Sequence, residues 1–265
     1  MADDADDRNG RDPAPAVSRS IRLLGLLADA GRPMTLTELA SALSLAKSST
    51  ANLCLALEAG GLIERVTTGF RLGLRIAELG GAFAAQFTQV REFYSVCEAS
   101  PVLSTELVQV ALLDGADVLY LARYEGARAE RLGAPLGSRL PAALSATGRA
   151  LLMTKPDAEV RALLTDAEPF PAAAENGTRT VTALLEKLDV ARERGWTLDD
   201  GEALNGIIGV AVSLEGWAPG DPQLALGVGM PAERADRAHV ERVAAALQDA
   251  AAALTNPLGA SSRRR

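Results

Sequence analysis

The chain is poor in the residues on which catalytic sites most often depend. It has one histidine, His239, and two cysteines, Cys54 and Cys97, in 265 residues. Two cysteines this far apart form neither a disulfide framework nor a zinc knuckle. A serine hydrolase would need the single histidine to meet a distant serine such as Ser145. The sequence therefore predicts no enzyme and no cofactor, with His239 as a solvated helix residue.

Two further patterns do not satisfy the requirements of the sites they resemble. The segment Gly227-Val228-Gly229 lacks the third glycine and the strand-to-helix setting of a dinucleotide-binding loop. Asp199-Asp200 and Glu202 have no histidine or cysteine beside them, so we expect these carboxylates to end a strand in solvent rather than to bind a metal.

Long apolar segments and targeting signals are also missing. A membrane-spanning helix needs roughly 20 apolar residues, whereas the run at 23–27 is interrupted by Gly25 and followed by Asp29. The start, Met1-Ala2-Asp3-Asp4, has neither the basic nor the apolar region of a signal peptide. We expect a cytoplasmic protein with no membrane association, and its length suits two domains.

Negative charge is unevenly spread along the chain. The net charge of −7 argues against general nucleic-acid binding, and an acidic tail over residues 1–16 is expected to be disordered. Residues 14–80, however, carry seven Lys and Arg residues against five Asp and Glu residues. This modest local excess of positive charge is compatible with attraction to DNA phosphates.

Residues 17–73 have the pattern of a winged helix-turn-helix. Helices are expected at 36–43 and 46–59, joined by a tight turn, with the small residue Ala40 where they cross. After a glycine pair, strands at 62–66 and 70–72 form a hairpin, the wing. The side chains expected to face base edges are Lys47, Ser48, Ala51 and Asn52, and those expected to face the core are Ala46, Ser49, Thr50, Leu53 and Leu57.

Three arginines are expected to contact phosphate around that helix. Arg65 and Arg71 lie on the wing, and Arg22 lies on a preceding helix whose expected inward residues are Ile21, Leu24 and Leu27. A helix over 74–89 links this domain to the rest of the chain. An apolar stripe that begins just before this helix either packs on its own domain or forms a dimer contact; its residues are Leu72, Ile76, Leu79 and Phe83.

The second domain, residues 90–256, mixes strands and helices in a way that predicts an α+β fold with an antiparallel sheet. A tail over 257–265 is expected to be disordered. Strands are expected at 107–113, 118–124, 196–198, 207–214 and 224–230, and helices at 145–154, 156–164, 180–194 and 232–254.

Three blocks between about residues 17 and 255 make a family resemblance specific. They are 45–49 with 70–73, 137–141 with 145–152, and 192–196 with Asp199, Glu202 and Gly206. In this order and spacing they resemble the isocitrate-lyase-regulator (IclR) family of bacterial transcription factors. The resemblance implies a winged helix-turn-helix, a linker helix and a GAF-like domain that binds a small effector. It also implies a homodimer, or a dimer of dimers, on partly symmetric double-stranded operator DNA.

The resemblance also implies where the effector binds. The matching positions are Ala146, Thr147, Asp199, Gly209, Gly227 and Gly229, with Ser145, Thr147 and backbone N–H groups to hold a carboxylate. Family members often have cysteine or serine where this chain has the three glycines. Either the glycines enlarge the cavity for a bulkier, aromatic or branched ligand, or they only relieve packing.

The recognition helix departs from the family pattern. Asn52 stands where an arginine is common, Ala46 where proline often starts the helix, and Ala51 where histidine or tyrosine is frequent. Asparagine pairs bidentately with adenine, which is worth roughly 1–3 kcal/mol of discrimination. We therefore expect an operator preference that differs from the family's.

The function that these patterns favour is a ligand-responsive, sequence-specific regulator of transcription. One alternative is a metabolite-binding protein whose winged helix serves protein assembly instead of DNA binding. Another is an esterase that uses Ser145.

Overall fold

The computed structural model describes residues 12–84, 86–129, 134–175, 177–216 and 221–255. The chain divides into two compact units, 1–86 and 87–265. The segment 74–89, expected as one linker helix, comprises α4 (Leu74–Ala84) in the first unit and the start of α5 (Thr88–Ala99) in the second.

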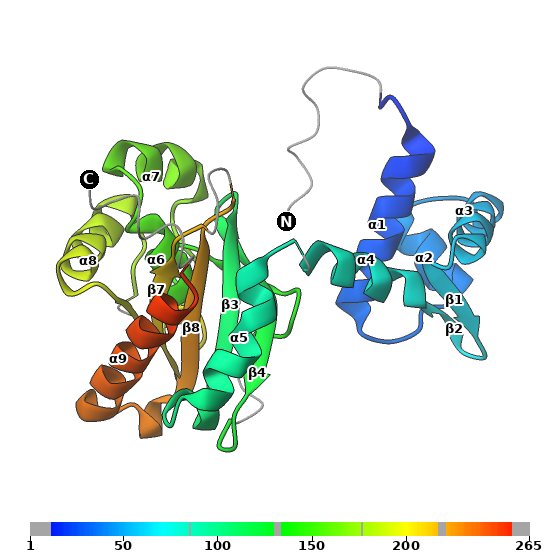
Figure 1. Ribbon diagram of the computed structural model, residues 1–265. Helices are drawn as coiled ribbons and strands as arrows, with labels where there is room; N and C mark the ends of the chain where they lie inside the picture. Colours follow the sequence, from blue (N-terminus) through cyan, green and yellow to red (C-terminus); the bar gives the residue numbers. More distant parts are fainter. Residues whose placement is uncertain (1–11, 85, 130–133, 176, 217–220, 256–265) are drawn as a thin grey trace. The chain divides into compact units, whose positions relative to one another are not determined.

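The first unit is a three-helix arrangement followed by a hairpin and α4 (Figure 1). A capping box starts its second helix, because Thr35 Oγ1 accepts the N–H of Glu38 while the Glu38 carboxylate accepts the N–H of Thr35. Ser44 adopts the left-handed conformation that ends this helix and opens the turn. The elements before α4 are α1 (Pro15–Ala30), α2 (Leu36–Leu43), α3 (Lys47–Ala59), β1 (Ile63–Val66) and β2 (Gly69–Leu72).

The wing is the expected hairpin, and a close approach anchors it to the helices. Met34 and Phe70 exchange both backbone hydrogen bonds, at 2.9 and 2.8 Å. A Cβ atom on Gly69 would lie 2.3 Å from Met34 O, and Gly69 has a φ of +139°. Glycine is the residue that satisfies both conditions, so the wing root depends on it.

The inward faces of two helices differ from expectation. On α1 the buried residues are Leu23 and Leu27, whereas Ile21 is 64% exposed, so its placement in the core was wrong. A repeat of three residues drifts around a helix that has 3.6 residues per turn, and the α1 core follows a spacing of four instead. On α3, Ser49 and the capping residue Ala46 are exposed, and the face toward the core consists of Thr50, Leu53, Cys54 and Leu57.

The second unit is built on a six-stranded antiparallel sheet with strand order β5-β4-β3-β8-β7-β6. The helices α6, α7 and α8 cover one face, and α5 and α9 cover the other (Figure 1). The strands are β3 (Leu107–Asp114), β4 (Asp117–Glu125), β5 (Arg139–Pro141), β6 (Thr197–Asp200), β7 (Ile207–Leu214) and β8 (Leu224–Pro231), and the helices after α5 are α6 (Ala146–Leu152), α7 (Asp157–Leu164), α8 (Val181–Arg194) and α9 (Arg237–Ala253).

The predicted α+β class and antiparallel sheet are confirmed. Two elements, α5 and β5, were not expected from the sequence. β5 is three residues long and pairs with β4 at the edge of the sheet. Arg139 lies opposite Leu119, Leu140 opposite Val118 and Pro141 opposite Asp117. Such a short strand carries no periodic signal. Within the described residues, no helix is long and apolar enough to cross a membrane.

Candidate functional site: a helix face for DNA and a cavity for a ligand

The exposed face of α3 carries most of the expected base-reading residues. Lys47, Ser48 and Asn52 are exposed, and Ala51 is half-buried at the edge of that face. Thr50 Oγ1 donates to Ala46 O at 3.2 Å, so its hydroxyl turns back toward the helix start. The structure thus leaves a small polar surface on the first two turns of α3.

The two wing arginines are both engaged with acidic side chains. Arg65 lies 3.8 Å from a carboxylate oxygen of Glu58, and its guanidinium stands over the Phe70 ring, 4.6 Å from the centroid. Arg71 forms an ion pair with Glu64 across the hairpin. Because both pairs are largely exposed, water and salt screen them, and the arginines can exchange a carboxylate for a phosphate at little cost.

Arg22 is exposed on α1. It shares the first unit with α3 and the wing, but no ion pair fixes the direction of its side chain among the described contacts. Its contact with phosphate stays a prediction, based on its charge and exposure.

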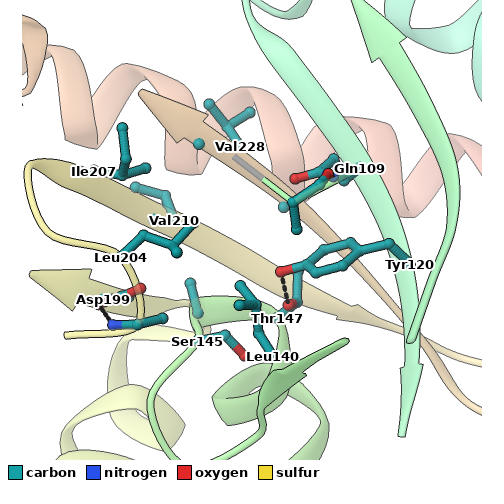
Figure 2. Close-up of a pocket in the computed structure, with 16 residues that line it drawn as sticks. Gln109, Tyr120, Leu140, Ser145, Thr147, Asp199, Leu204, Ile207, Val210 and Val228 are labelled. Atoms are coloured by element: carbon teal, nitrogen blue, oxygen red, sulfur yellow. Dashed lines mark hydrogen bonds between the residues drawn. The ribbon is translucent and has the colours of Figure 1, made fainter. Parts of the chain in front are cut away.

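All seven residues expected to bind the effector line one cavity in the second unit (Figure 2). The cavity lies between the start of α6 and strands β3, β4, β7 and β8, and it contains about 430 Å³ of space between atoms, counting its open mouth. Most of this space is narrow. The expected residues are Ser145, Ala146, Thr147, Asp199, Gly209, Gly227 and Gly229, and Gln109, Tyr120, Leu140, Leu204 and Ile207 are among those that join them.

Neutral polar groups give the cavity much of its hydrogen-bonding capacity. Ser145 caps α6, since its Oγ accepts the N–H of Gly148 at 3.2 Å. The hydroxyls of Tyr120 and Thr147 lie 3.1 Å apart in a hydrogen bond, drawn as a dashed line in Figure 2. Gln109 Nε2 donates to Ala134 O at 2.7 Å. Burial raises the pKa of Tyr120 to about 12, so this phenol stays neutral and available as a donor.

The three glycines do not all add room to the cavity. A Cβ on Gly209 would lie 3.0 Å from the Cβ of Ala146, and one on Gly227 would lie 2.6 Å from Cγ2 of Thr147. At these two positions the space is taken by α6, which packs closely on the sheet. A Cβ on Gly229 would meet only Ile207, at 3.8 Å. Packing thus accounts for two of the glycines, and Gly229 alone leaves open space.

Asp199 is the one acidic side chain among the described lining residues. It is 5% exposed, and its Oδ1 accepts the backbone N–H groups of Glu202 at 2.6 Å and Ala203 at 3.3 Å. Burial raises the pKa of Asp199 to about 6, although those two N–H groups and the positive charge of Arg149 act in the opposite direction. The expectation that Asp199 ends a strand in solvent was wrong.

Glu202 is also buried, because it completes an ion cluster behind the cavity. Its carboxylate lies 2.9 Å from Nη2 of Arg149 and 2.6 Å from Nζ of Lys187, and it accepts the N–H of Thr178. Burial alone would raise the pKa of Glu202, but the Lys187 hydrogen bond, the Arg149 charge and Thr178 lower it to about 2. No local pattern around residues 199–202 identifies Arg149, which is distant in the sequence, as the partner of Glu202. The sequence therefore could not predict that Glu202 is buried.

The described residues include no group of three histidine, cysteine, aspartate or glutamate side chains that could hold a metal ion. His239 is largely buried rather than solvated as expected, with Nε2 3.2 Å from Oε1 of Glu106 and Nδ1 near Arg242. Its described contacts are to these residues and not to Ser145. The Ser145 hydroxyl instead holds the start of α6.

Two lining residues, Gln109 and Tyr120, were not predicted from the sequence. Gln109 is a polar residue within the apolar run of β3, and a buried polar side chain in a strand usually has a specific partner. That signal was available in the sequence. For Tyr120 there was none, since tyrosine is common in strands.

Comparison with known proteins agrees with this arrangement. Residues 16–67 match the IclR helix-turn-helix domain, and residues 97–256 match the C-terminal domain of bacterial IclR transcriptional regulators. The chain belongs to the IclR family. This confirms the resemblance seen in the sequence, and with it the assignment of the chain as a DNA-binding regulator of transcription.

Individual relatives support the same family and fold. The transcriptional repressor AllR of Salmonella typhimurium is 29% identical over 237 residues, which cover 83% of this chain and 81% of AllR. The crystal structure of IclR from Thermotoga maritima has a TM-score of 0.73 at 20% identity, covering 91% of this chain and 97% of that one. An IclR homologue from Microbacterium hydrocarbonoxydans, solved with 4-hydroxybenzoate, has a TM-score of 0.76 at 24% identity, covering 90% and 97%.

The raised pKa of Asp199 predicts a specific pH dependence of stability. In the folded state the Asp199 carboxyl stays protonated up to about pH 6, whereas in the unfolded state it loses its proton near pH 4. The stability that this group contributes is therefore lost as the pH rises through 6. Asp199→Asn removes the ionisation but retains an oxygen that accepts the two N–H groups. The free energy of unfolding of Asp199→Asn relative to wild type should rise by about 1 kcal/mol between pH 5 and pH 8.

Urea unfolding at the two pH values, followed by tryptophan fluorescence, measures this difference. Both tryptophans, Trp196 and Trp217, lie after residue 86 in the sequence, so the signal reports on the second unit. The exposed neighbour Asp200 gives the matched control, because Asp200→Asn should not reproduce the pH-dependent gain. A relative stability that is flat with pH would contradict the assignment.

Proposed function

We propose that α3 and the wing bind operator DNA and that a small, carboxylate-bearing metabolite in the cavity modulates this binding. The observation that carries the proposal is the convergence of all seven expected effector positions on one cavity. In the same chain, the helix-turn-helix match spans the helix with the exposed polar face. An effector shifts operator affinity only if it binds one conformation of the protein more tightly than another.

On the DNA side, Lys47, Ser48, Ala51 and Asn52 face base edges, with Asn52 suited to adenine. Arg22, Arg65 and Arg71 contact phosphates, which position the protein without reading sequence. The ion pairs of the two wing arginines reduce the net attraction of the first unit for DNA in general. This balance favours selective over indiscriminate binding.

On the effector side, the donors are the hydroxyls of Ser145, Thr147 and Tyr120 with the backbone N–H groups that begin α6. Among the described lining residues there is no lysine, arginine or histidine, so neutral donors hold the carboxylate. The homologue solved with 4-hydroxybenzoate shows an aromatic acid bound by a protein of this fold. A ligand of that class extends toward the open space at Gly229.

The same features argue against the other roles. The relatives are regulators, and Ser145 is committed to capping α6, so we infer that the chain is not an enzyme and acts in the cytoplasm on chromosomal DNA. The assembly alternative is not favoured, because the helix-turn-helix keeps an exposed polar recognition face.

We also propose that the protein acts as a homodimer, or a dimer of dimers, on a partly symmetric operator. A single α3 reads few base pairs, and a two-fold axis doubles the sequence that is read. Exposed apolar side chains on two other helices of the first unit, Val17 and Ile21 on α1 and Leu74 and Leu79 on α4, provide the surface that a second copy covers.

The DNA proposal predicts different effects for a substitution on α3 and a substitution on the wing. Selection of genomic fragments at physiological salt should enrich one partly symmetric site. Asn52→Ala should change the base preference at one position of each half-site. Arg71→Gln should weaken all DNA alike and lower the slope of log affinity against log salt by about 0.9 for each copy of the chain bound. Arg237→Gln, which removes an exposed positive charge at the start of α9 in the other unit, is the control. Equal salt slopes for Arg71→Gln and wild type would refute the phosphate contact.

The effector proposal predicts that filling the space at Gly229 blocks the response but not DNA binding. Organic acids, 4-hydroxybenzoate among them, are screened for a change in operator affinity of the wild type. Gly229→Val places its side chain into the open part of the cavity, so an active compound should lose at least tenfold in potency. Operator affinity without the compound is the internal control. Undiminished potency would place the effector elsewhere.

The dimer proposal predicts that charge on the apolar face of the first unit disrupts assembly. Ile21→Glu combined with Leu79→Glu should shift the sedimenting species from dimer toward monomer, because both side chains are exposed in the single chain and a dimer through this face would bury the new charges. Val190→Glu, an exposed apolar position on α8, is the control and should sediment as wild type does. A dimer of unchanged stability in the double variant would exclude this face as the interface.

A further inference from the structure

One side chain on the exposed face of α3 does not fit a purely polar recognition surface. Leu55 is 57% exposed, although it lies in the middle of a thirteen-residue helix whose other large apolar side chains, Leu53 and Leu57, are packed against the domain core. An isolated exposed leucine is ordinary on a protein surface. Its place on a helix that enters DNA makes this one informative.

The helical geometry puts Leu55 on the same face as the expected base-reading residues. Successive residues turn by about 100°, so Ser48, Asn52 and Leu55 point within about 60° of one another. The buried residues Thr50 and Cys54 point to the opposite side. Leu55 thus lies one turn after Asn52, along the line that leads from the start of α3.

Base chemistry limits what such a side chain can contact. Base edges in the major groove present hydrogen-bond donors and acceptors, with a single apolar group, the C5-methyl of thymine. A leucine packed against the polar base edges would displace water from them without replacing the hydrogen bonds that the water made. Against a thymine methyl, the same side chain gains by removing apolar surface from water.

We propose that Leu55 reads a thymine methyl in the operator half-site, next to the adenine contacted by Asn52. Three residues of helix advance by about 4.5 Å, and base pairs are about 3.4 Å apart, so the two contacts fall on neighbouring or next-neighbouring base pairs. The inference rests on DNA binding through α3. It adds a specificity determinant of apolar chemistry and an expected A·T-rich step in each half-site.

A second copy of the chain is the competing occupant of this surface. The distribution of exposed apolar side chains favours DNA, since the other candidates for a protein contact in the first unit lie on α1 and α4. The residues one turn from Leu55 along α3 are Ala51, Asn52, Glu58 and Ala59, all of them small or polar. An interface core would need further large apolar residues there.

Replacing thymine by deoxyuridine tests the contact, because it removes the methyl group and leaves every hydrogen-bonding group in place. The site selected from genomic DNA with the full-length protein is synthesised with each thymine replaced in turn. Wild type should lose about fourfold in affinity at one position per half-site, the value of one buried methyl group. Leu55→Ala should bind the thymine and uracil versions of that position equally.

The controls separate this contact from other effects. Val190→Ala, which shortens an exposed apolar side chain in the other unit, should keep the wild-type sensitivity to uracil. Circular dichroism and sedimentation establish that Leu55→Ala is folded and assembled as wild type.

Each other outcome overturns the proposal. A wild type that tolerates uracil at every position has no methyl contact. Equal sensitivity in wild type and Leu55→Ala assigns the methyl to another residue, and a changed sedimentation of Leu55→Ala assigns Leu55 to a protein interface. If no site is enriched in the selection, DNA reading by α3 itself fails, which is distinct from losing the methyl contact alone.

Discussion

The guanidinium group of Arg149 ties together the segments that surround the ligand cavity. It is 2% exposed and donates to Ala143 O, Leu198 O and the Thr178 hydroxyl while pairing with Glu202. A buried arginine that lost its carboxylate would cost about 3–5 kcal/mol, so these four segments are held in one arrangement. The start of α6, the edge strand β6 and the turn after it therefore keep fixed positions, and the cavity is formed between them and the sheet.

This pairing also determines the chemistry of the cavity. Arg149 and Lys187 are neutralised on the outer side of the 199–202 turn, and the turn presents Asp199 on the inner side. The described lining is consequently rich in neutral donors, with one carboxylate whose pKa is raised by burial. Asp199 Oδ1 accepts the backbone N–H of Glu202, the residue whose carboxylate completes the ion cluster, so the cavity lining and the cluster share one turn.

In the first unit, too, positive side chains are paired with negative ones. Its wing arginines are balanced by Glu58 and Glu64, so its attraction to phosphate is moderate. Selectivity must then come from groups that read bases, and the exposed face of α3 carries the amide of Asn52 and the apolar side chain of Leu55. An acidic protein can in this way bind one site tightly without binding all DNA.

The sequence by itself determined the fold class, the order of most elements and seven of the positions that line the cavity. Periodicity, glycine stops and capping residues such as Thr35 determine helices and strands through nearby residues. The three blocks shared with the family locate the effector positions along the chain. Only the tertiary structure decided that Asp199 is buried, that α6 fills the space beside Gly209, and which side of α1 faces the core. These outcomes depend on partners distant in the sequence, above all Arg149, and burial is set by the sum of such contacts rather than by any local pattern.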